Sequence, residues 1–308
     1  MQSTIDDFQR YGGPGAAVGV LIASGDQHAT ASADLAARLR ACGGFFFTGG
    51  DQSRIVDTFR PGQTTSLAYE SIRERHQQGA FIAGTSAGAA MMSDPMIGGG
   101  DSLLALSHGV CHEDGCPGVW LRDGMGFWSG WITDQHFLAR GRVGRLLTAL
   151  LEASDGPRLG LGVDEDTAVI VDGELAEVVG RSGAMIINAA TADRREAGWS
   201  GITMTLYGPG DRFRLSDQAL VERGAALRER GAEPPTALGP ELAFEGWNFA
   251  RSLIAIGGQQ APAPVTLRGE GWTIVVTPHA DFSAGALVGP HAVGFVGPFL
   301  LDVSLPRP

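Results

Sequence analysis

Residues 80–90, which read AFIAGTSAGAA, are the most informative part of the sequence for its architecture. Residues 80–83 have the apolar composition of a buried strand, and the small residues after Ser86 suit the start of a helix. Ser86 therefore occupies a Gly-x-Ser-x-Gly string on a predicted strand-to-helix turn, where a strained backbone exposes the hydroxyl above a sheet. The string predicts a nucleophilic serine, and the competing interpretation is a tightly packed helix N-cap.

The segments before this turn alternate between strand and helix patterns. Continuous apolar runs at residues 16–24 and 45–48 predict buried strands, and the spacing of apolar positions at residues 32–41 and 66–78 predicts helices. Strands alternating with helices at this spacing are typical of an α/β fold with a parallel sheet. We therefore expect an α/β fold whose mostly parallel sheet has helices on both faces.

The segments after the turn are less regular. Residues 97–130 are rich in glycine and aromatic residues with little periodicity, as in long functional loops. Strand-like segments follow at residues 131–133, 159–163, 167–171, 184–188 and 202–207. From about residue 216 the composition changes: a predicted helix rich in Ala, Arg and Glu and a Pro-rich patch at residues 234–235 precede a strand-like tail at 272–277. We therefore predict a catalytic domain over residues 1–217 and a C-terminal extension over residues 218–308.

The composition limits the class of protein. The chain has 308 residues, 44% apolar and 19% charged, which is typical of a soluble globular protein. Its net charge of −11 argues against nucleic-acid or anionic-membrane partners. We find neither a signal-peptide pattern nor an apolar run of transmembrane length. The three cysteines Cys42, Cys111 and Cys116 are too few for a disulfide framework, so we expect reduced thiols and a cytoplasmic location.

A nucleophilic serine needs a base and an acid that orients the base. Of the seven histidines, His136 is the best candidate because it directly follows a strand-like segment. The acid is either Glu165, at the end of a strand pattern where α/β folds place catalytic groups, or Asp134, two residues from His136. We favour Glu165. The structural alternative is a loop network of Asp134 and His136 beside a surface helix.

Four motifs in order resemble those of the cyanophycinase family, which comprises serine exopeptidases related to dipeptidase E with a fold like that of class I glutamine amidotransferases. The motifs are FFTGGDQ at residues 46–52, GTSAGA at 84–89, DQHF at 134–137 followed by three arginines, and GVDEDTA at 162–168. The YGPGDRF segment at residues 207–213 also resembles the end of that domain. The resemblance covers roughly residues 17–217.

The resemblance implies a catalytic triad of Ser86, His136 and Glu165. It also implies an oxyanion hole formed by the Gly50 turn and the Ala87 amide, and no metal or cofactor. The chain order of serine, histidine and acid differs from the serine, acid, histidine order of α/β-hydrolases. Members of the family cleave β-aspartyl linkages and release β-Asp-Arg from cyanophycin. Related folds are often dimers, so a homodimer is expected by analogy.

The resemblance further implies a set of substrate-binding residues, because a β-aspartyl substrate carries a free carboxylate beside the scissile carbonyl. Guanidinium groups suit such a carboxylate. The residues that match the family's pocket are Gln52, Asp134, Gln135, Arg140, Arg142 and Arg145. The three arginines do not share one helix face, so we expect one or two in the pocket and the other bridging structural carboxylates.

The chain departs from the family pattern at both ends. One or two strand–helix units that family members have at the N-terminus are not recognisable here. Residues 252–258 and 274–279 faintly resemble those strands, so the extension is either an appended module or a tail that completes the sheet. If these differences remodel the substrate pocket, the alternative function is a related amide hydrolase or acyl transferase of a biosynthetic pathway. If the catalytic activity has been lost, the alternative is a non-catalytic binding scaffold.

A second cluster of residues could be interpreted as a metal site. It consists of His108, Cys111, His112 and Cys116. Its spacing matches no common zinc pattern, so a loop cluster that covers the Ser86 site is the better interpretation.

Overall fold

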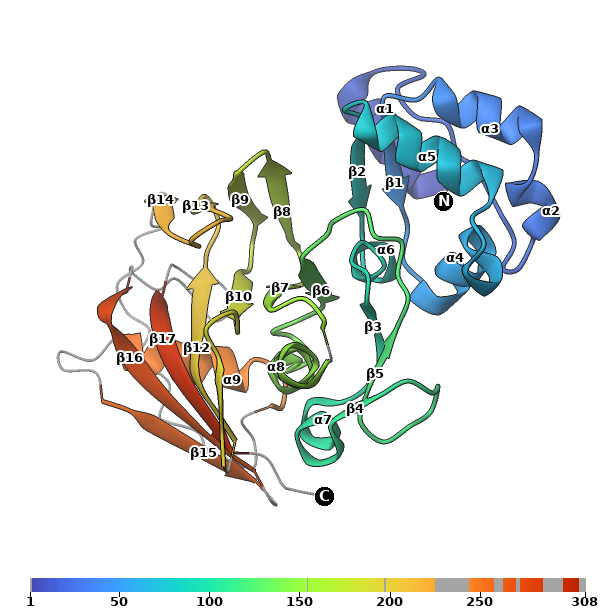
Figure 1. Ribbon diagram of the computed structural model, residues 1–308. Helices are drawn as coiled ribbons and strands as arrows, with labels where there is room; N and C mark the ends of the chain where they lie inside the picture. The colour runs from blue at the N-terminus through green and yellow to red at the C-terminus, as the bar shows by residue number, and fades with distance from the viewer. Residues whose placement is uncertain are drawn as a thin grey trace. The chain divides into compact units, whose positions relative to one another are not determined.

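The computed structural model describes residues 2–153, 155–196, 198–224, 244–257, 263–269, 272–284 and 296–304 (Figure 1). The chain divides into two compact units. Unit 1 comprises Met1–Met92 and Asp123–Phe127, and unit 2 comprises Ser93–Arg122 and Trp128–Pro308.

Unit 1 is built on two parallel strands, β1 (Gly44–Phe47) and β2 (Phe81–Gly84). Its helices are α1 (Gln2–Gly12), α2 (Gln27–Thr30), α3 (Ala33–Arg40), α4 (Gln52–Phe59), the 3-10 helix η1 (Pro61–Gln63), α5 (Leu67–Gln77) and α6 (Ala87–Ala90). Figure 1 shows α3 and α5 side by side, and α5 also contacts β1.

Several helices of unit 1 begin where a short polar side chain caps them. Ser32 accepts a hydrogen bond from the backbone N–H of Leu35, and Ser66 accepts one from that of Tyr69. These caps open α3 and α5, so the predicted helices at residues 32–41 and 66–78 are confirmed. The predicted strands at 45–48 and 80–83 are confirmed as β1 and β2.

The predicted strand at residues 16–24 is wrong. In the described part of the chain this segment pairs with no other strand, and Val18 and Leu21 are 73% and 81% exposed. An apolar run becomes a strand only where a neighbouring strand satisfies its backbone groups. Residues 16–24 therefore have the composition of a strand but no partner strand among the described residues.

Unit 2 is centred on an eight-stranded sheet whose main path runs β15-β16-β17-β12-β10-β7-β6, with β11 paired to β12. Its strands are β6 (Trp131–Gln135), β7 (Leu159–Val163), β10 (Ala184–Asn188), β11 (Asp193–Arg195), β12 (Gly198–Tyr207), β15 (Val265–Gly269), β16 (Trp272–Ala284) and β17 (Val296–Ser304). The predicted strands at 131–133, 159–163, 184–188, 202–207 and 272–277 are confirmed.

The α/β class is confirmed, but the sheet is mixed where we expected it to be mostly parallel. In the described part of this sheet only β6 and β7 are parallel, and the other neighbours are antiparallel. The reason lies in the connections. The helix α8 (Val143–Glu152) links β6 to β7 as a crossover, whereas β15 and β16 join as a hairpin.

Helices cover one face of this sheet, and a second sheet covers the other face. This corrects the expectation that helices cover both faces. Met185 and Ile187 of β10 belong to the larger core with α8 and α9 (Asn248–Gly257). Ala184 and Ile186 point the other way. They pack in a second core with a four-stranded sheet, which consists of β8 (Thr167–Asp172), β9 (Leu175–Gly180), β13 (Arg212–Arg214) and β14 (Leu220–Glu222). The predicted strand at 167–171 is confirmed as β8.

The Gly-rich segment at residues 97–130 is more ordered than a loop. It contains the end of β3 (Met96–Gly99), then α7 (Ser102–His108), β4 (Val110–Cys111) and β5 (Val119–Arg122). Cys111 and Cys116 form a disulfide with their Cα atoms 6.4 Å apart, which corrects the expectation of reduced thiols. The turn between β4 and β5 brings these two cysteines together, and their spacing alone did not indicate it.

The described part of the predicted extension joins the main sheet, because β17 pairs with β12. Residues 274–279 lie in β16, whereas 252–257 lie in α9, so the expected strand there is wrong. The apolar positions of this segment follow a helical repeat, with Phe249, Leu253 and Ile256 buried. The predicted Ala/Arg/Glu helix falls largely outside the described residues, as does the patch at 234–235. The boundary near Asp217 stays a prediction.

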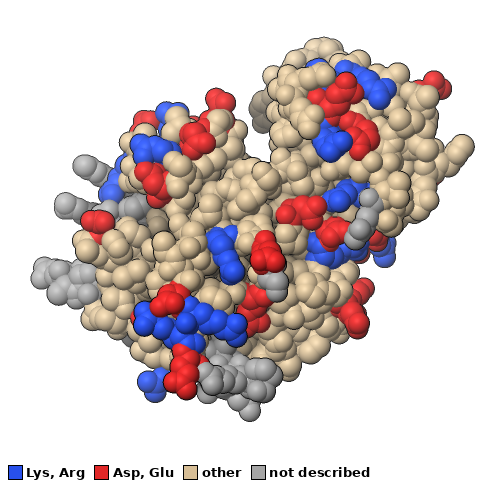
Figure 2. All heavy atoms as spheres, in the orientation of Figure 1, with Lys and Arg blue, Asp and Glu red and all other residues tan. Residues whose placement is uncertain are grey.

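Two further properties of the described chain concern membrane spans and surface charge. Within the described ranges, the helices lack the length and apolar character that a membrane span requires. Figure 2 shows acidic and basic side chains interspersed on the face in view.

Candidate active site

Ser86 lies in unit 1, between the end of β2 and the first residue of α6. Its backbone has φ 54° and ψ −119°, a conformation that a residue with a side chain rarely adopts. The chain therefore turns sharply at Ser86, as the Gly-x-Ser-x-Gly string predicted. Strain of this kind persists only where the surrounding structure enforces it.

The neighbouring glycines enforce the turn through close approach. A Cβ atom added at Gly84 would lie 2.2 Å from the carbonyl oxygen of Gly88, and one added at Gly88 would lie 2.2 Å from that of Phe47. Because both obstacles are backbone atoms, neither glycine can be replaced without moving β1 or α6. The Thr85 N–H donates to the Phe47 carbonyl at 3.0 Å, which ties the turn to β1.

The Gly49-Gly50 turn lies beside the serine. A Cβ atom added at Gly49 would lie 3.0 Å from Cβ and 3.5 Å from Oγ of Ser86, and Gly50 has φ 141°. Ala87 is buried as the first residue of α6, and Gln52 is buried as the first residue of α4. Unit 1 thus brings together Ser86, the glycine turn and Ala87, and it holds Gln52 two residues after Gly50.

His136 lies in unit 2, immediately after β6, with φ 48°. Its Nδ1 atom lies 2.8 Å from Oε1 of Glu165, which follows β7. Since β6 and β7 are parallel neighbours with Gln135 opposite Val163, both residues leave the sheet at the same edge. The histidine side chain is 24% exposed and the glutamate side chain 50% exposed. With its N–H on Nδ1, a neutral ring carries its basic lone pair on Nε2.

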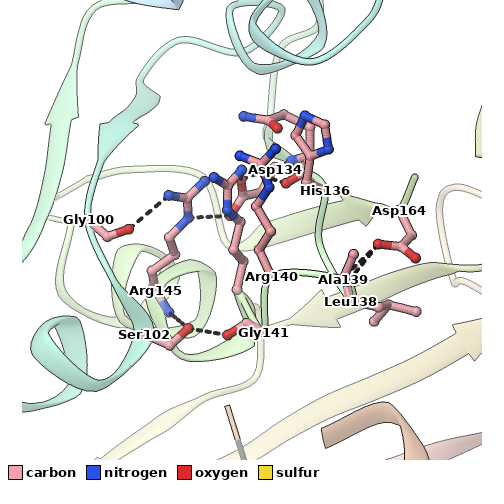
Figure 3. A network of polar contacts seen from close by, with 12 residues as sticks. Gly100, Ser102, Asp134, His136, Leu138, Ala139, Arg140, Gly141, Arg145 and Asp164 are labelled. Atoms are coloured by element: carbon pink, nitrogen blue, oxygen red, sulfur yellow. Dashed lines mark hydrogen bonds and ion pairs between the residues drawn. The ribbon is translucent and has the colours of Figure 1, made fainter. Parts of the chain in front are cut away.

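The Asp134 carboxylate binds Arg145. The Nε and Nη2 atoms of Arg145 donate to the two carboxylate oxygens at 2.8 and 2.5 Å (Figure 3). Nη1 of the same guanidinium donates to the Gly100 carbonyl at 2.9 Å. Both side chains are almost completely buried, so this is a bidentate ion pair that links β6 to α8 and to the segment after β3.

Arg142 and Arg140 are placed differently from Arg145. Nη1 of Arg142 donates to the Gln135 carbonyl at 2.7 Å and lies 3.8 Å from the Asp134 carboxylate, while the side chain is 16% exposed. Burial, with Arg145 nearby, lowers the pKa of Arg142 to about 10. Arg140 is exposed, with Nε 3.8 Å from Oε1 of Glu165. Gln135 is buried, and its side-chain oxygen has no hydrogen-bond partner among the described residues.

Asp164 lies in the GVDEDTA motif, but the motif indicated a role for Glu165 alone. The buried carboxylate of Asp164 accepts hydrogen bonds from the Leu138 and Ala139 amides at 3.0 and 2.8 Å (Figure 3). It also accepts one from the Ser182 hydroxyl at 2.7 Å. Burial raises the pKa of Asp164 above its ordinary value. Its position directly after β7 could have marked Asp164 as a candidate functional residue. Glu165 is only one residue further along, so this position does not distinguish the two acids.

The metal interpretation is not supported by the geometry. Among the described residues there is no group of three or more histidine, cysteine or acidic side chains that could hold a metal ion. The disulfide uses the sulfur atoms of Cys111 and Cys116.

A serine on a strained strand-to-helix turn and a histidine bonded to a glutamate are parts that serine hydrolases use. The family model of peptidase family S51 matches residues 15–179, which is more than half of the chain. The chain therefore belongs to peptidase family S51, and the resemblance seen in its motifs is confirmed.

The curated relatives include cyanophycinases. One from Trichormus variabilis is 33% identical over 202 residues, which are 62% of this chain and 63% of that protein. One from Synechococcus elongatus is 34% identical over 166 residues, or 53% of this chain and 47% of that protein. The chain thus spans under two thirds of the length of these relatives. A crystal structure of a peptidase from an acI-B1 Actinobacterium has a TM-score of 0.40 and 21% identity, covering 52% of this chain and 59% of that one.

Proposed function

We propose that this chain is a serine peptidase of the cyanophycinase type, which cleaves β-aspartyl or related amide bonds through Ser86, His136 and Glu165. The observation that carries the proposal is the backbone of Ser86, with φ 54° and ψ −119° at a strand-to-helix turn. The membership of family S51 supports the same assignment. A merely structural N-cap needs no such strain, because an N-cap residue ordinarily has β-region dihedral angles.

In the proposed reaction, Nε2 of His136 accepts the hydroxyl proton of Ser86 while Oγ attacks the scissile carbonyl carbon. The protonated ring is stabilised by Glu165, which lies 2.8 Å from Nδ1. The ring then gives its proton to the departing amine, which leaves an acyl group on Oγ. Water, deprotonated by the same histidine, releases the acid and restores the hydroxyl.

The oxyanion that forms in this reaction needs preorganised N–H donors. We assign that role to the amides of Gly50 and Ala87. The close approach of the Gly49-Gly50 turn to the Ser86 side chain supports the assignment. Removing one such donor in a serine hydrolase lowers kcat by about 100-fold to 1,000-fold.

The substrate pocket is assigned to the residues that the family resemblance implied, and their bonding suggests distinct roles. Asp134 and Arg145 bind each other, so we propose that they hold the pocket wall. Arg140 and Arg142 keep positive charge near the His136–Glu165 pair, and we propose that they recognise the substrate carboxylate. Gln52 and Gln135 are the proposed polar contacts for the rest of the peptide.

The first experiment combines active-site labelling with product analysis. The wild-type chain and the Ser86→Ala, His136→Ala and Glu165→Gln variants are treated with a fluorophosphonate probe, with Ser24→Ala as a control at an exposed serine of the same unit. We expect labelling of the wild type and Ser24→Ala, none of Ser86→Ala, and slow labelling of the other two. Labelling that persists in Ser86→Ala would contradict the proposal.

The second experiment tests the linkage. The β-Asp-Arg and α-Asp-Arg dipeptides differ only in which carboxyl group forms the amide, so they are a matched substrate pair. An insoluble cyanophycin preparation is the third substrate, because β-Asp-Arg is the product that members of the family release from it. We expect hydrolysis of cyanophycin or of the β-linked dipeptide, and none of the α-linked dipeptide. Labelling without hydrolysis of any of the three would favour an acyl transferase or a different amide substrate. Neither labelling nor hydrolysis would favour a binding scaffold.

A further inference from the structure

The turn that carries His136 is held by a carboxylate that takes no part in the proposed reaction. Asp164 Oδ1 accepts from the backbone N–H groups of Leu138 and Ala139 at 3.0 and 2.8 Å. Oδ2 accepts from the Ser182 hydroxyl at 2.7 Å. One side chain therefore joins three segments: the turn after β6, the end of β7, and the connection between β9 and β10.

This turn needs external support because His136 has φ 48°, which is unfavourable for a residue with a side chain. Within the turn, the Arg140 N–H donates to the His136 carbonyl at 3.0 Å, the Gly141 N–H to the Leu138 carbonyl at 3.1 Å, and the Arg142 N–H to the Phe137 carbonyl at 2.9 Å. The two amides that Asp164 binds lie two and three residues after His136. Asp164 therefore holds the backbone that directly follows the histidine.

The packing around the turn leaves it little freedom once Asp164 is in place. A Cβ atom added at Gly162 would lie 2.2 Å from the Phe137 ring, so the ring fits only over a glycine. Phe137 is fully buried. The buried ring and the carboxylate therefore both hold the segment that follows His136.

We propose that Asp164 is a positioning residue for His136: it sets the backbone of the turn so that Nδ1 faces Glu165. The inference rests on the proposed function for its catalytic meaning. Asp164 is not a catalytic residue, because it acts through the backbone of the turn.

Asp211 is a matched control, because it has the same local chemistry without the histidine. Its carboxylate is buried and accepts from the backbone N–H groups of Gly208 and Gly224 at 2.7 and 2.9 Å. Burial raises its pKa, as it raises that of Asp164. Asp211→Ala therefore reports what loss of a buried turn carboxylate does to unit 2 in general.

The test compares Asp164→Ala, Asp164→Asn and Asp211→Ala in the full chain. Asparagine retains an oxygen that accepts from both amides, and its NH₂ group donates to the Ser182 hydroxyl oxygen. We expect Asp164→Ala to lower kcat for the substrate that the wild type hydrolyses by about 100-fold with a smaller change in KM. We expect Asp164→Asn to restore most of kcat and Asp211→Ala to leave it near the wild-type value.

The second readout does not depend on activity. In ¹⁵N-histidine NMR spectra, the signals of His136 are identified by their absence in His136→Ala. We expect the wild type and Asp164→Asn to show the Nδ1–H tautomer, and Asp164→Ala to show a mixture of tautomers. If Asp164→Ala fails to fold, Ser182→Ala removes one of the three bonds and should give a smaller change of the same kind.

Either of two results would overturn the inference. One is an Asp164→Ala ring that keeps the wild-type tautomer. The other is a fall in kcat no larger than that of Asp211→Ala. If the wild type hydrolyses no substrate but the NMR changes occur, the proposed function fails and the positioning of the ring stands. If Ser86 and His136 prove essential while the NMR spectra are unchanged, only the role of Asp164 fails.

Discussion

The Ser86 turn in unit 1 and the His136 turn in unit 2 both hold a residue with positive φ, but by different means. The Ser86 turn depends on the absence of side chains, since Gly84 and Gly88 each face a backbone carbonyl at 2.2 Å from an added Cβ. The His136 turn depends on charges and donors buried around it, above all the carboxylates of Asp134 and Asp164. Adding a methyl group at Gly84 or Gly88 should therefore distort the Ser86 turn. Removing a buried carboxylate should distort the His136 turn.

The largest expected effect tests whether the two turns serve one reaction. Ser86→Ala and His136→Ala should each lower kcat by about 10⁴-fold or more, because nucleophile and base act as a unit. The double variant should be no worse than either single one. The measurement is steady-state kinetics on the substrate that the wild type hydrolyses, with protein whose circular dichroism is unchanged. Effects that multiply in the double variant would contradict a shared reaction.

The next effect concerns the buried charges of unit 2. Arg145→Met should destabilise the chain by about 3–5 kcal/mol, because it leaves the Asp134 carboxylate buried without its partner. The double variant Asp134→Leu/Arg145→Met should recover most of this loss. Urea unfolding followed by tryptophan fluorescence is a selective measurement, since all six tryptophans lie in unit 2. Equal stability of the single and double variants would show that the pair is not held as described.

The third effect concerns the close approach in unit 1. Gly88→Ala should destabilise unit 1 by about 1–3 kcal/mol through overpacking against Phe47. Gly43→Ala is the matched control, because a Cβ there has no neighbour within 4 Å. Hydrogen exchange measured by mass spectrometry resolves peptides of each unit, and we expect faster exchange in β1 and β2 with unit 2 unchanged. Similar exchange in both variants would refute the packing argument.

The smallest expected effect is a dependence on pH. Burial raises the pKa of Asp211 above its ordinary value of 3.8, so the folded state holds this proton more tightly than the unfolded state. The contribution of Asp211 to stability therefore falls as the pH rises from 3.8 to the folded-state pKa. Asp211→Asn lacks this contribution, so its stability relative to the wild type should improve over that interval. Urea unfolding at a series of pH values measures the difference, and parallel curves would rule out the raised pKa.

Local patterns predicted those parts of the fold and site that depend on neighbouring residues. The helical spacing at residues 32–41 and 66–78 and the apolar run before Ser86 are each visible in a short segment, and the structure has α3, α5 and β2 there. The run at residues 16–24 looked the same as a strand, but a strand also needs a partner that no local pattern names. The ion pair of Asp134 with Arg145 joins residues eleven apart, and its geometry depends on how α8 packs on β6.

The sheet direction and Asp164 could not be predicted for a related reason. Whether β10 runs parallel or antiparallel to β7 depends on the whole intervening β8–β9 hairpin, and apolar runs have no direction. Asp164 and Glu165 are adjacent acids at a strand end. Only the register of β6 against β7 directs one carboxylate toward the backbone of the turn and the other toward the ring.

The place of β17 in the main sheet has a consequence for the synthesis of the chain. The strands that carry His136 and Glu165 pair with near neighbours in the sequence, whereas Ile202 of β12 meets Leu301 of β17 about 100 residues later. At about 5–20 residues per second, β12 is an open sheet edge for roughly 5–20 s of translation. During that interval the unpaired edge can bind another nascent chain, so the yield of soluble protein should depend on the translation rate and on chaperones more than the isolated fold would suggest.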